Sequence, residues 1–203
     1  MSGARLLYTV GHSSQSIEQF VSQLQRHGIE LIADVRSQPY SKRYPHFSRE
    51  ALQKSLTVAD IRYLFLGREL GARRDEPQCC VDGQASYQEI ARLPNFVRGI
   101  ERLLDSADKY RIALTCAEHD PLTCHRTILV CRELRQRNVS IKHILRGGEL
   151  EEHAQAELRL IEEELGSSDQ ADLFTRPDNP ELLVERAYTA RAGRIAYRHE
   201  KQH

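Results

Sequence analysis

The chain lacks the long apolar runs and the charge imbalance that mark membrane proteins and many nucleic-acid-binding proteins. No segment approaches the roughly 18 consecutive apolar residues that a membrane-spanning helix needs. The 29 Lys and Arg residues balance 29 Asp and Glu residues, so no overall field attracts a polyanion. The apolar stretch near the N-terminus is too short for a secretory signal. We therefore expect a cytoplasmic protein without a membrane partner.

Familiar cofactor and disulfide signatures are absent as well. The chain has no Gly-x-Gly-x-x-Gly, no Walker loop and no His-Glu-x-x-His, so no particular cofactor is predicted. Its 5 cysteines are an odd number and do not indicate a disulfide framework. Hydrophobic residues at 40% and charged residues at 29% are typical of a globular protein with a buried core.

Strand and helix signals alternate along residues 1–148, which we assign to a core domain. Short β-rich apolar runs predict strands, and capped or periodic segments between them predict helices. Such alternation is typical of an α/β fold with a mostly parallel sheet and helices on both faces. The predicted strands are Leu6–Val10, Ile29–Val35, Ile61–Leu66, Arg111–Cys116 and Ser140–Leu145; the predicted helices are 16–28, 48–56, 87–108 with a break at Pro94, and 125–138; residues 72–85 are expected to be irregular.

Residues 149–203 differ from this core in composition. Glu149–Leu165 is rich in Ala, Glu and Leu and predicts a helix, and a polar linker follows near residues 166–180. Glu181–Tyr188 predicts another helix, and residues 195–197 a short final strand or contact. We therefore predict a helical C-terminal extension that packs on the core or on another subunit.

Polar side chains follow three of the predicted strands directly. The clusters are Gly11-His12-Ser13, Asp34-Val35-Arg36 and Cys116-Ala117-Glu118. Right-handed crossovers bring the carboxyl ends of parallel strands to one edge, and ligands of open α/β sheets bind there. We therefore expect these side chains to share one site at that edge of the sheet.

The segment Thr115–Arg126 carries the densest chemistry. Cys116 ends a strand, Pro121 sets a turn, and Cys124 precedes a predicted helix whose N-terminus favours a thiolate and an anion. Arg126 could complete the anion site with a forked contact. Cys116 lies 10 residues before Arg126, which does not fit the Cys-x5-Arg loop of cysteine phosphatases. Packing of both thiols in the core remains an equal alternative.

Three hypotheses follow for the function. The first is an enzyme acting on a small phosphate-bearing or nucleotide-like substrate, without a bound metal. The second is a nucleic-acid-associated or regulatory binding module that uses the Arg-rich loops 36–49 and 68–74. The third is Zn or Fe binding by Cys116, Cys124 and nearby histidines, although no Cys-x2-Cys pair supports it. The catalytic candidates are His12, Cys116, Glu118 and Cys124; the substrate-binding candidates are Ser13, Asp34, Arg36, Ser41, His125 and Arg126.

Five motifs occur together in a characteristic order: TVGHSSQSIEQF, IADVRSQPYSKRYPHFS, YLFLGRELGA, ALTCAEHDPLTCHR and SIKHIL. Over residues 5–148 they resemble the family known as domain of unknown function 488, and the tail is similar to an extension on some longer members. The resemblance implies a compact α/β domain, mostly bacterial and archaeal, without an established reaction. The usual double glycine is Gly71-Ala72 here. The family motif positions are Gly11, His12, Ser13, Asp34, Arg36, Pro39, Ser41, Phe47, Tyr63, Leu66, Gly67, Cys116, Glu118, Cys124, His125 and Arg126.

Overall fold

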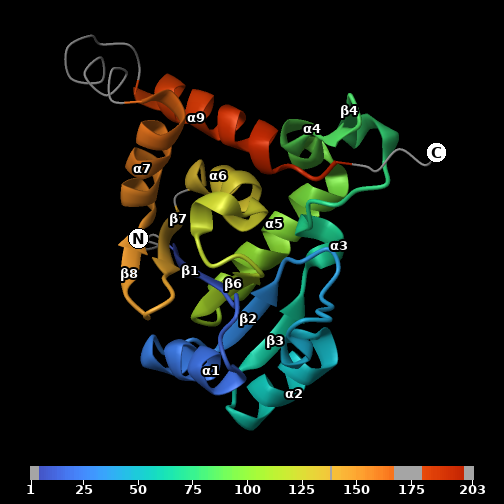
Figure 1. Cartoon of the computed structure of the whole chain (residues 1–203). Helices are drawn as coiled ribbons and strands as arrows, with labels where there is room; N and C mark the ends of the chain where they lie inside the picture. The colour runs from blue at the N-terminus through green and yellow to red at the C-terminus, as the bar shows by residue number, and fades with distance from the viewer. Residues whose placement is uncertain (1–4, 138, 167–179, 199–203) are drawn as a thin grey trace.

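The structure, a computed structural model, describes residues 5–137, 139–166 and 180–198. Its centre is a six-stranded sheet in the order β3-β2-β6-β1-β7-β8 (Figure 1). Five strands run parallel, and β8 (Leu150–Glu152) pairs antiparallel with β7 at one edge. This confirms the predicted α/β fold with a mostly parallel sheet. The parallel strands are β1 (Arg5–Gly11), β2 (Leu31–Asp34), β3 (Arg62–Phe65), β6 (Ile112–Cys116) and β7 (Val139–Ile144).

Helices cover both faces of the sheet, because successive strand residues point to opposite sides. Ile32 packs on one face with Phe20 of α1 (Ile17–Arg26) and Leu52 of α2 (Arg49–Val58). Its neighbours Leu31 and Ala33 join the larger cluster on the other face. That cluster is covered by α5 (Pro94–Ala107), α6 (Arg132–Arg135), α7 (His153–Leu165) and α9 (Pro180–Ile195), which lie on the side of the sheet away from α1 and α2 (Figure 1).

Several helix boundaries lie where the local sequence predicts them. Ser16 caps α1, since its hydroxyl accepts from the backbone N–H of Gln19 while the Gln19 side chain accepts from Ser16. The chain leaves this helix at Gly28, whose φ of 62° favours glycine. Pro94 separates α4 (Tyr87–Arg92) from α5, which confirms the predicted break. Among the described residues, no helix is long and apolar enough to cross a membrane.

Other boundaries differ from the prediction. The helix expected from Glu149 begins at His153, because residues 150–152 pair with β7 as an edge strand. The helix expected over 125–138 is a π-helix, η4 (Arg126–Cys131), followed by α6. The stretch expected to be irregular contains η2 (Pro77–Cys79) and the short hairpin of β4 (Cys80–Val81) and β5 (Gln84–Ala85). The shorter elements are η1 (Pro45–Phe47), α3 (Gly67–Leu70) and η3 (Pro121–Thr123).

The C-terminal extension is helical, as predicted, and packs on the core. Helix α9 extends to Ile195, beyond the predicted end at Tyr188. The segment that follows contacts the hairpin, where the Ala85 N–H donates to the carbonyl of Tyr197 and Gln84 pairs with Arg198. Most of the predicted linker, residues 167–179, and Asn138 lie outside the described residues.

Candidate active site at the carboxyl edge of the sheet

The carboxyl ends of β1, β2 and β6 are tied together by backbone hydrogen bonds. The N–H groups of His12 and Ser13 donate to the carbonyls of Cys116 and Ala117. Gly11 makes this approach possible, because a Cβ there would lie 1.7 Å from the carbonyl oxygen of Glu118. The strand-end clusters predicted to meet are therefore held side by side.

A pocket of about 380 Å³ lies at this edge. Seven of the predicted site residues line it, which supports the expectation that they share one place: His12, Arg36, Ser41, Cys116, Glu118, Cys124 and His125. Loops, helix α4 and the C-terminal extension supply further wall residues, including Ser37, Gln38, Tyr40, Arg73, Tyr87, Ile195 and Tyr197. Three predicted residues are not in its wall: Ser13, Asp34 and Arg126.

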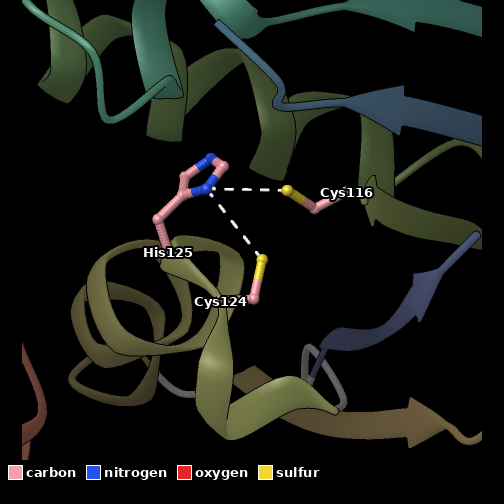
Figure 2. Close-up of side chains that lie close together, drawn as sticks. All are labelled: Cys116, Cys124 and His125. Atoms are coloured by element: carbon pink, nitrogen blue, oxygen red, sulfur yellow. Dashed lines mark hydrogen bonds between the residues drawn. The ribbon is translucent and has the colours of Figure 1, made fainter. Parts of the chain in front are cut away.

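One wall of the pocket carries two thiols and an imidazole. Figure 2 shows the His125 ring facing both sulfur atoms, with Cys116 at the end of β6 and Cys124 beside His125 before η4. The His125 Nδ1 atom lies 3.6 Å from the Sγ of Cys116 and 3.9 Å from the Sγ of Cys124. These three atoms all lie within 4.8 Å of one another. The cysteines are buried, and His125 is half-buried.

The orientation of this imidazole is set by its other nitrogen. The Nε2 atom of His125 lies 3.0 Å from the carbonyl oxygen of Val35, and a carbonyl can only accept, so Nε2 carries a hydrogen. In the neutral ring, Nδ1 therefore presents its lone pair to the two sulfur atoms. The backbone N–H of Arg126 donates to the Sγ of Cys124 over 3.5 Å, which stabilises negative charge on that sulfur.

The two thiols differ in acidity. The hydrogen bond with Cys124 and burial raise the pKa of Cys116 well above its ordinary value. Burial opposes ionisation of Cys124, yet the hydrogen bond from Cys116, the charge of Arg126 and the neighbouring His125 lower its pKa well below the ordinary value. Burial lowers the pKa of His125, but its contact with Cys124 outweighs that effect and raises it. Cys124 is therefore the more acidic thiol of the pair.

Glu118 lies beside this cluster. Its Oε2 atom accepts from the Cys116 thiol over 3.4 Å. The residue as a whole is exposed, but desolvation of its carboxyl group and the charge of Cys124 raise its pKa. A carboxyl group with a raised pKa is suited to proton transfer near neutral pH.

A second network holds Arg36 in the pocket wall. Asp34 is fully buried and accepts two hydrogen bonds from the Arg36 guanidinium, at 2.9 and 2.6 Å, and one from the Tyr63 hydroxyl at 2.7 Å. His12 stacks on Phe47, and its Nε2 accepts from Arg36 while its Nδ1 donates to the carbonyl of Ser13. Burial lowers the pKa of His12 to about 4, so the ring is neutral. Asp34 and Arg36 thus form a buried ion pair.

Arg126 has a different position from the one expected. It has no exposed surface, and its guanidinium donates to the carbonyls of Glu118 at 2.6 Å and His119 at 3.0 Å. Its Nε donates to the Thr9 hydroxyl. All of its side-chain nitrogens therefore bind the chain itself. Arg126 fixes the loop that carries Glu118, and it does not present a fork to a ligand in the pocket.

The remaining predicted groups also bind the protein. The Ser41 hydroxyl accepts from the Tyr44 N–H, and Ser13, with a φ of 46°, donates its backbone N–H to Ala117. In the Arg-rich loops, Arg74 is buried and donates to two backbone carbonyls, while Arg73 is exposed and stacks over the Tyr197 ring. Arg73 lies in the loop 68–74 that the binding-module hypothesis used, whereas sequence reasoning missed Tyr197 as a pocket residue, since it does not follow a strand of the sheet.

Comparisons with known proteins add a family but no activity. A family model described as "Domain of unknown function DUF488" matches residues 16–132. Among curated proteins, none matches the chain. One solved structure, a candidate phosphatase (DUF442) from Shewanella putrefaciens CN-32, is similar at 11% identity, covering 96% of this chain and 91% of that chain. Its TM-score of 0.37 is too low to support a common fold or activity.

Proposed function

The chain belongs to the family of domain of unknown function DUF488, and we propose that it is an enzyme acting on a small phosphate-bearing or nucleotide-like molecule. The convergence of Cys116, Cys124 and His125 within 4.8 Å on the wall of a 380 Å³ pocket carries this proposal. Concave sites with a few convergent polar groups are the usual places where small ligands bind and react.

The charges of the pocket wall favour an anion. Arg73 presents an exposed guanidinium to it, whereas buried Asp34 balances the charge of Arg36, and Glu118 is the one acidic side chain among its described wall residues. The pKa of Glu118 is raised, which reduces the negative charge that an anion would meet. The guanidinium of Arg73 is exposed at the rim and donates to Gln38, so it retains donors for a phosphate oxygen.

The other walls suit a ring system. Tyr40, Tyr87 and Tyr197 line the pocket together with Ile195. Aromatic faces stack with nucleobases independently of their hydrogen-bonding edges. A phosphate near Arg73 and a ring against these side chains would place one end of the substrate near the thiols.

The residues of the pocket wall have different proposed roles. Cys116, Cys124 and His125 meet the reacting group, and Glu118 gives or takes a proton beside them. His12 acts as a positioning residue, because both of its ring nitrogens are engaged by Arg36 and Ser13. Arg36 and Ser41 form the wall that orients the substrate.

Binding and turnover test this proposal. The protein is titrated calorimetrically with AMP and inorganic pyrophosphate, and a panel of phosphate esters and nucleotides is assayed for products. We expect binding that Arg73→Gln weakens by about tenfold, the loss of roughly one charge-assisted hydrogen bond. The matched control is Arg92→Gln, an exposed arginine outside the pocket wall. Binding that both variants leave unchanged, or no binding of either anion, would contradict the proposal.

A further inference from the structure

We propose that Cys116, Cys124 and His125 bind one zinc ion, with the fourth ligand position open to the pocket. The zinc ion would be the reactive group of the pocket described above. Its role in a reaction therefore rests on the proposed function. Metal binding itself is measurable without any substrate.

The spacing of the ligand atoms fits a tetrahedral centre. Zinc lies about 2.3 Å from a cysteine sulfur and about 2.0–2.1 Å from a histidine nitrogen, so a sulfur and a nitrogen on one tetrahedron are about 3.6 Å apart. Here Nδ1 of His125 lies 3.6 Å from Sγ of Cys116 and 3.9 Å from Sγ of Cys124. The three side chains need little movement to accept the ion.

The surroundings of the ligands favour the same assignment. A histidine that binds a metal through one nitrogen usually donates its other N–H to a carbonyl or carboxylate, and His125 donates Nε2–H to Val35. The Arg126 N–H donates to the Cys124 sulfur, and such bonds support a thiolate ligand. A zinc ion would take the place of a proton between these groups, and it would bind the lone pair of Nδ1 and both sulfur atoms.

The composition of the set selects the metal and the type of site. Two thiolates and one imidazole suit zinc, whereas magnesium and calcium prefer oxygen ligands. Structural zinc sites close with four protein ligands, but catalytic sites keep one position for water or substrate. Glu118 contacts Cys116 but lies outside the group of three atoms within 4.8 Å of one another. Because all three ligands line the pocket, the open position faces it.

Zinc would explain why these groups lie in this pocket. A zinc ion with an open position activates a bound water molecule or polarises a phosphoryl oxygen. Both effects serve a reaction at a phosphate-bearing substrate. The rival states of the same cluster are a Cys116–Cys124 disulfide and a metal-free pair of thiols.

Metal analysis of the full chain tests the proposal. Protein purified without a metal-chelating tag is saturated with zinc, dialysed and measured by mass spectrometry of its elements. We expect about one zinc ion per chain. In addition, cobalt bound in place of zinc should show thiolate charge-transfer absorption. Folded wild-type protein that retains less than about a tenth of that zinc, or a disulfide found by intact mass under nonreducing conditions, would overturn the proposal.

Variants locate the ion. Cys124→Ser and His125→Ala should each weaken zinc binding at least about 100-fold, the loss expected for a ligand. Cys80→Ser is the matched control, because this half-buried thiol lies outside the pocket wall and should bind zinc like the wild type. Zinc retained at wild-type affinity by both ligand variants would place the ion elsewhere and overturn the assignment. If zinc binds as expected but AMP and pyrophosphate do not, the proposed function fails while the metal site stands.

Discussion

Two clusters of polar side chains in this protein, each containing histidine, have opposite hydrogen-bonding patterns. His143 of β7 and His153, the first residue of α7, are buried, and half-buried His125 lies at the carboxyl edge of the sheet. Both groups consist of polar side chains from segments that pack against each other. The difference lies in whether the protein itself satisfies every nitrogen.

In the first group every donor meets an acceptor. The Thr9 hydroxyl lies 2.7 Å from Nδ1 of His143, and Nε2 of His143 lies 3.0 Å from Nδ1 of His153. Nε2 of His153 then lies 3.1 Å from the Tyr188 hydroxyl, which donates to Glu157. A single set of proton positions satisfies this whole chain with both rings neutral. We call it the His143–His153 chain.

In the second group a lone pair and two sulfurs face one another and the pocket. His125 uses Nε2 for Val35, and among the described residues its Nδ1 has only the thiols of Cys116 and Cys124 as partners. Burial of a histidine therefore does not by itself indicate function. The direction of its hydrogen bonds separates the structural chain from the candidate site.

The largest expected effect comes from Arg126, which contacts both regions. Arg126→Ala removes the donors to the Glu118 and His119 carbonyls and to Thr9, and it leaves a cavity in the core. We expect the free energy of unfolding to fall by about 3–5 kcal/mol in urea denaturation. Arg92→Ala, which removes an exposed ion pair, should cost less than about 0.5 kcal/mol. Equal effects of the two variants would show that Arg126 does not hold the fold.

Acid should destabilise the His143–His153 chain next most strongly. Burial lowers the pKa of His153 to about 4, and the pKa of His143 is lowered too, so the unfolded chain binds protons more readily. The free energy of unfolding should therefore keep its full contribution from these histidines above about pH 6.5 and should decrease as the pH falls toward 4. His153 should account for roughly 3 kcal/mol of that decrease. Urea denaturation of the wild type and His153→Gln at pH 7 and pH 4.5 measures this share. A pH dependence that His153→Gln does not reduce would contradict it.

A smaller loss is expected at the far end of the same chain. Tyr188→Phe removes the hydroxyl between His153 and Glu157 without changing the volume of the ring. We expect a loss of about 1–2 kcal/mol of unfolding free energy and unchanged zinc affinity. Tyr40→Phe, at an exposed tyrosine, serves as the control. Weaker zinc binding by Tyr188→Phe would show that the two regions are coupled.

The smallest effect on stability should come from the candidate site itself. Glu118→Gln keeps the shape of an exposed side chain, so the free energy of unfolding should change by less than about 0.5 kcal/mol. Turnover of any substrate found should fall by about 100-fold, because the proton carrier is lost. Full activity of Glu118→Gln would remove it from the proposed mechanism.

The gathering of the site could be predicted because parallel strands end at one edge of a sheet. His12, Arg36 and Cys116 each follow a predicted strand, and all three line the pocket. Burial of Arg126 could not be read from its position at a helix start, since its acceptors are carbonyls of a folded loop. Tyr197 reaches the pocket because the segment after α9 contacts the hairpin of β4 and β5.

Contacts between segments that are distant in the sequence also explain why the edge strand β8 and the His143–His153 chain were not predicted. The strand Leu150–Glu152 depends on pairing with β7 rather than on its own composition, which favours a helix. The His143–His153 chain joins residues of β1, β7, α7 and α9, and no local pattern in the sequence marks that contact.

X-ray absorption at the zinc edge of the loaded wild-type protein tests the central claim most directly. The account predicts two sulfur scatterers at about 2.3 Å, one imidazole nitrogen at about 2.0 Å and one further light atom. Addition of AMP should alter only the light-atom contribution, because the open position faces the pocket. A first shell made of oxygen and nitrogen alone would contradict the claim that the two cysteines and His125 act together on the pocket.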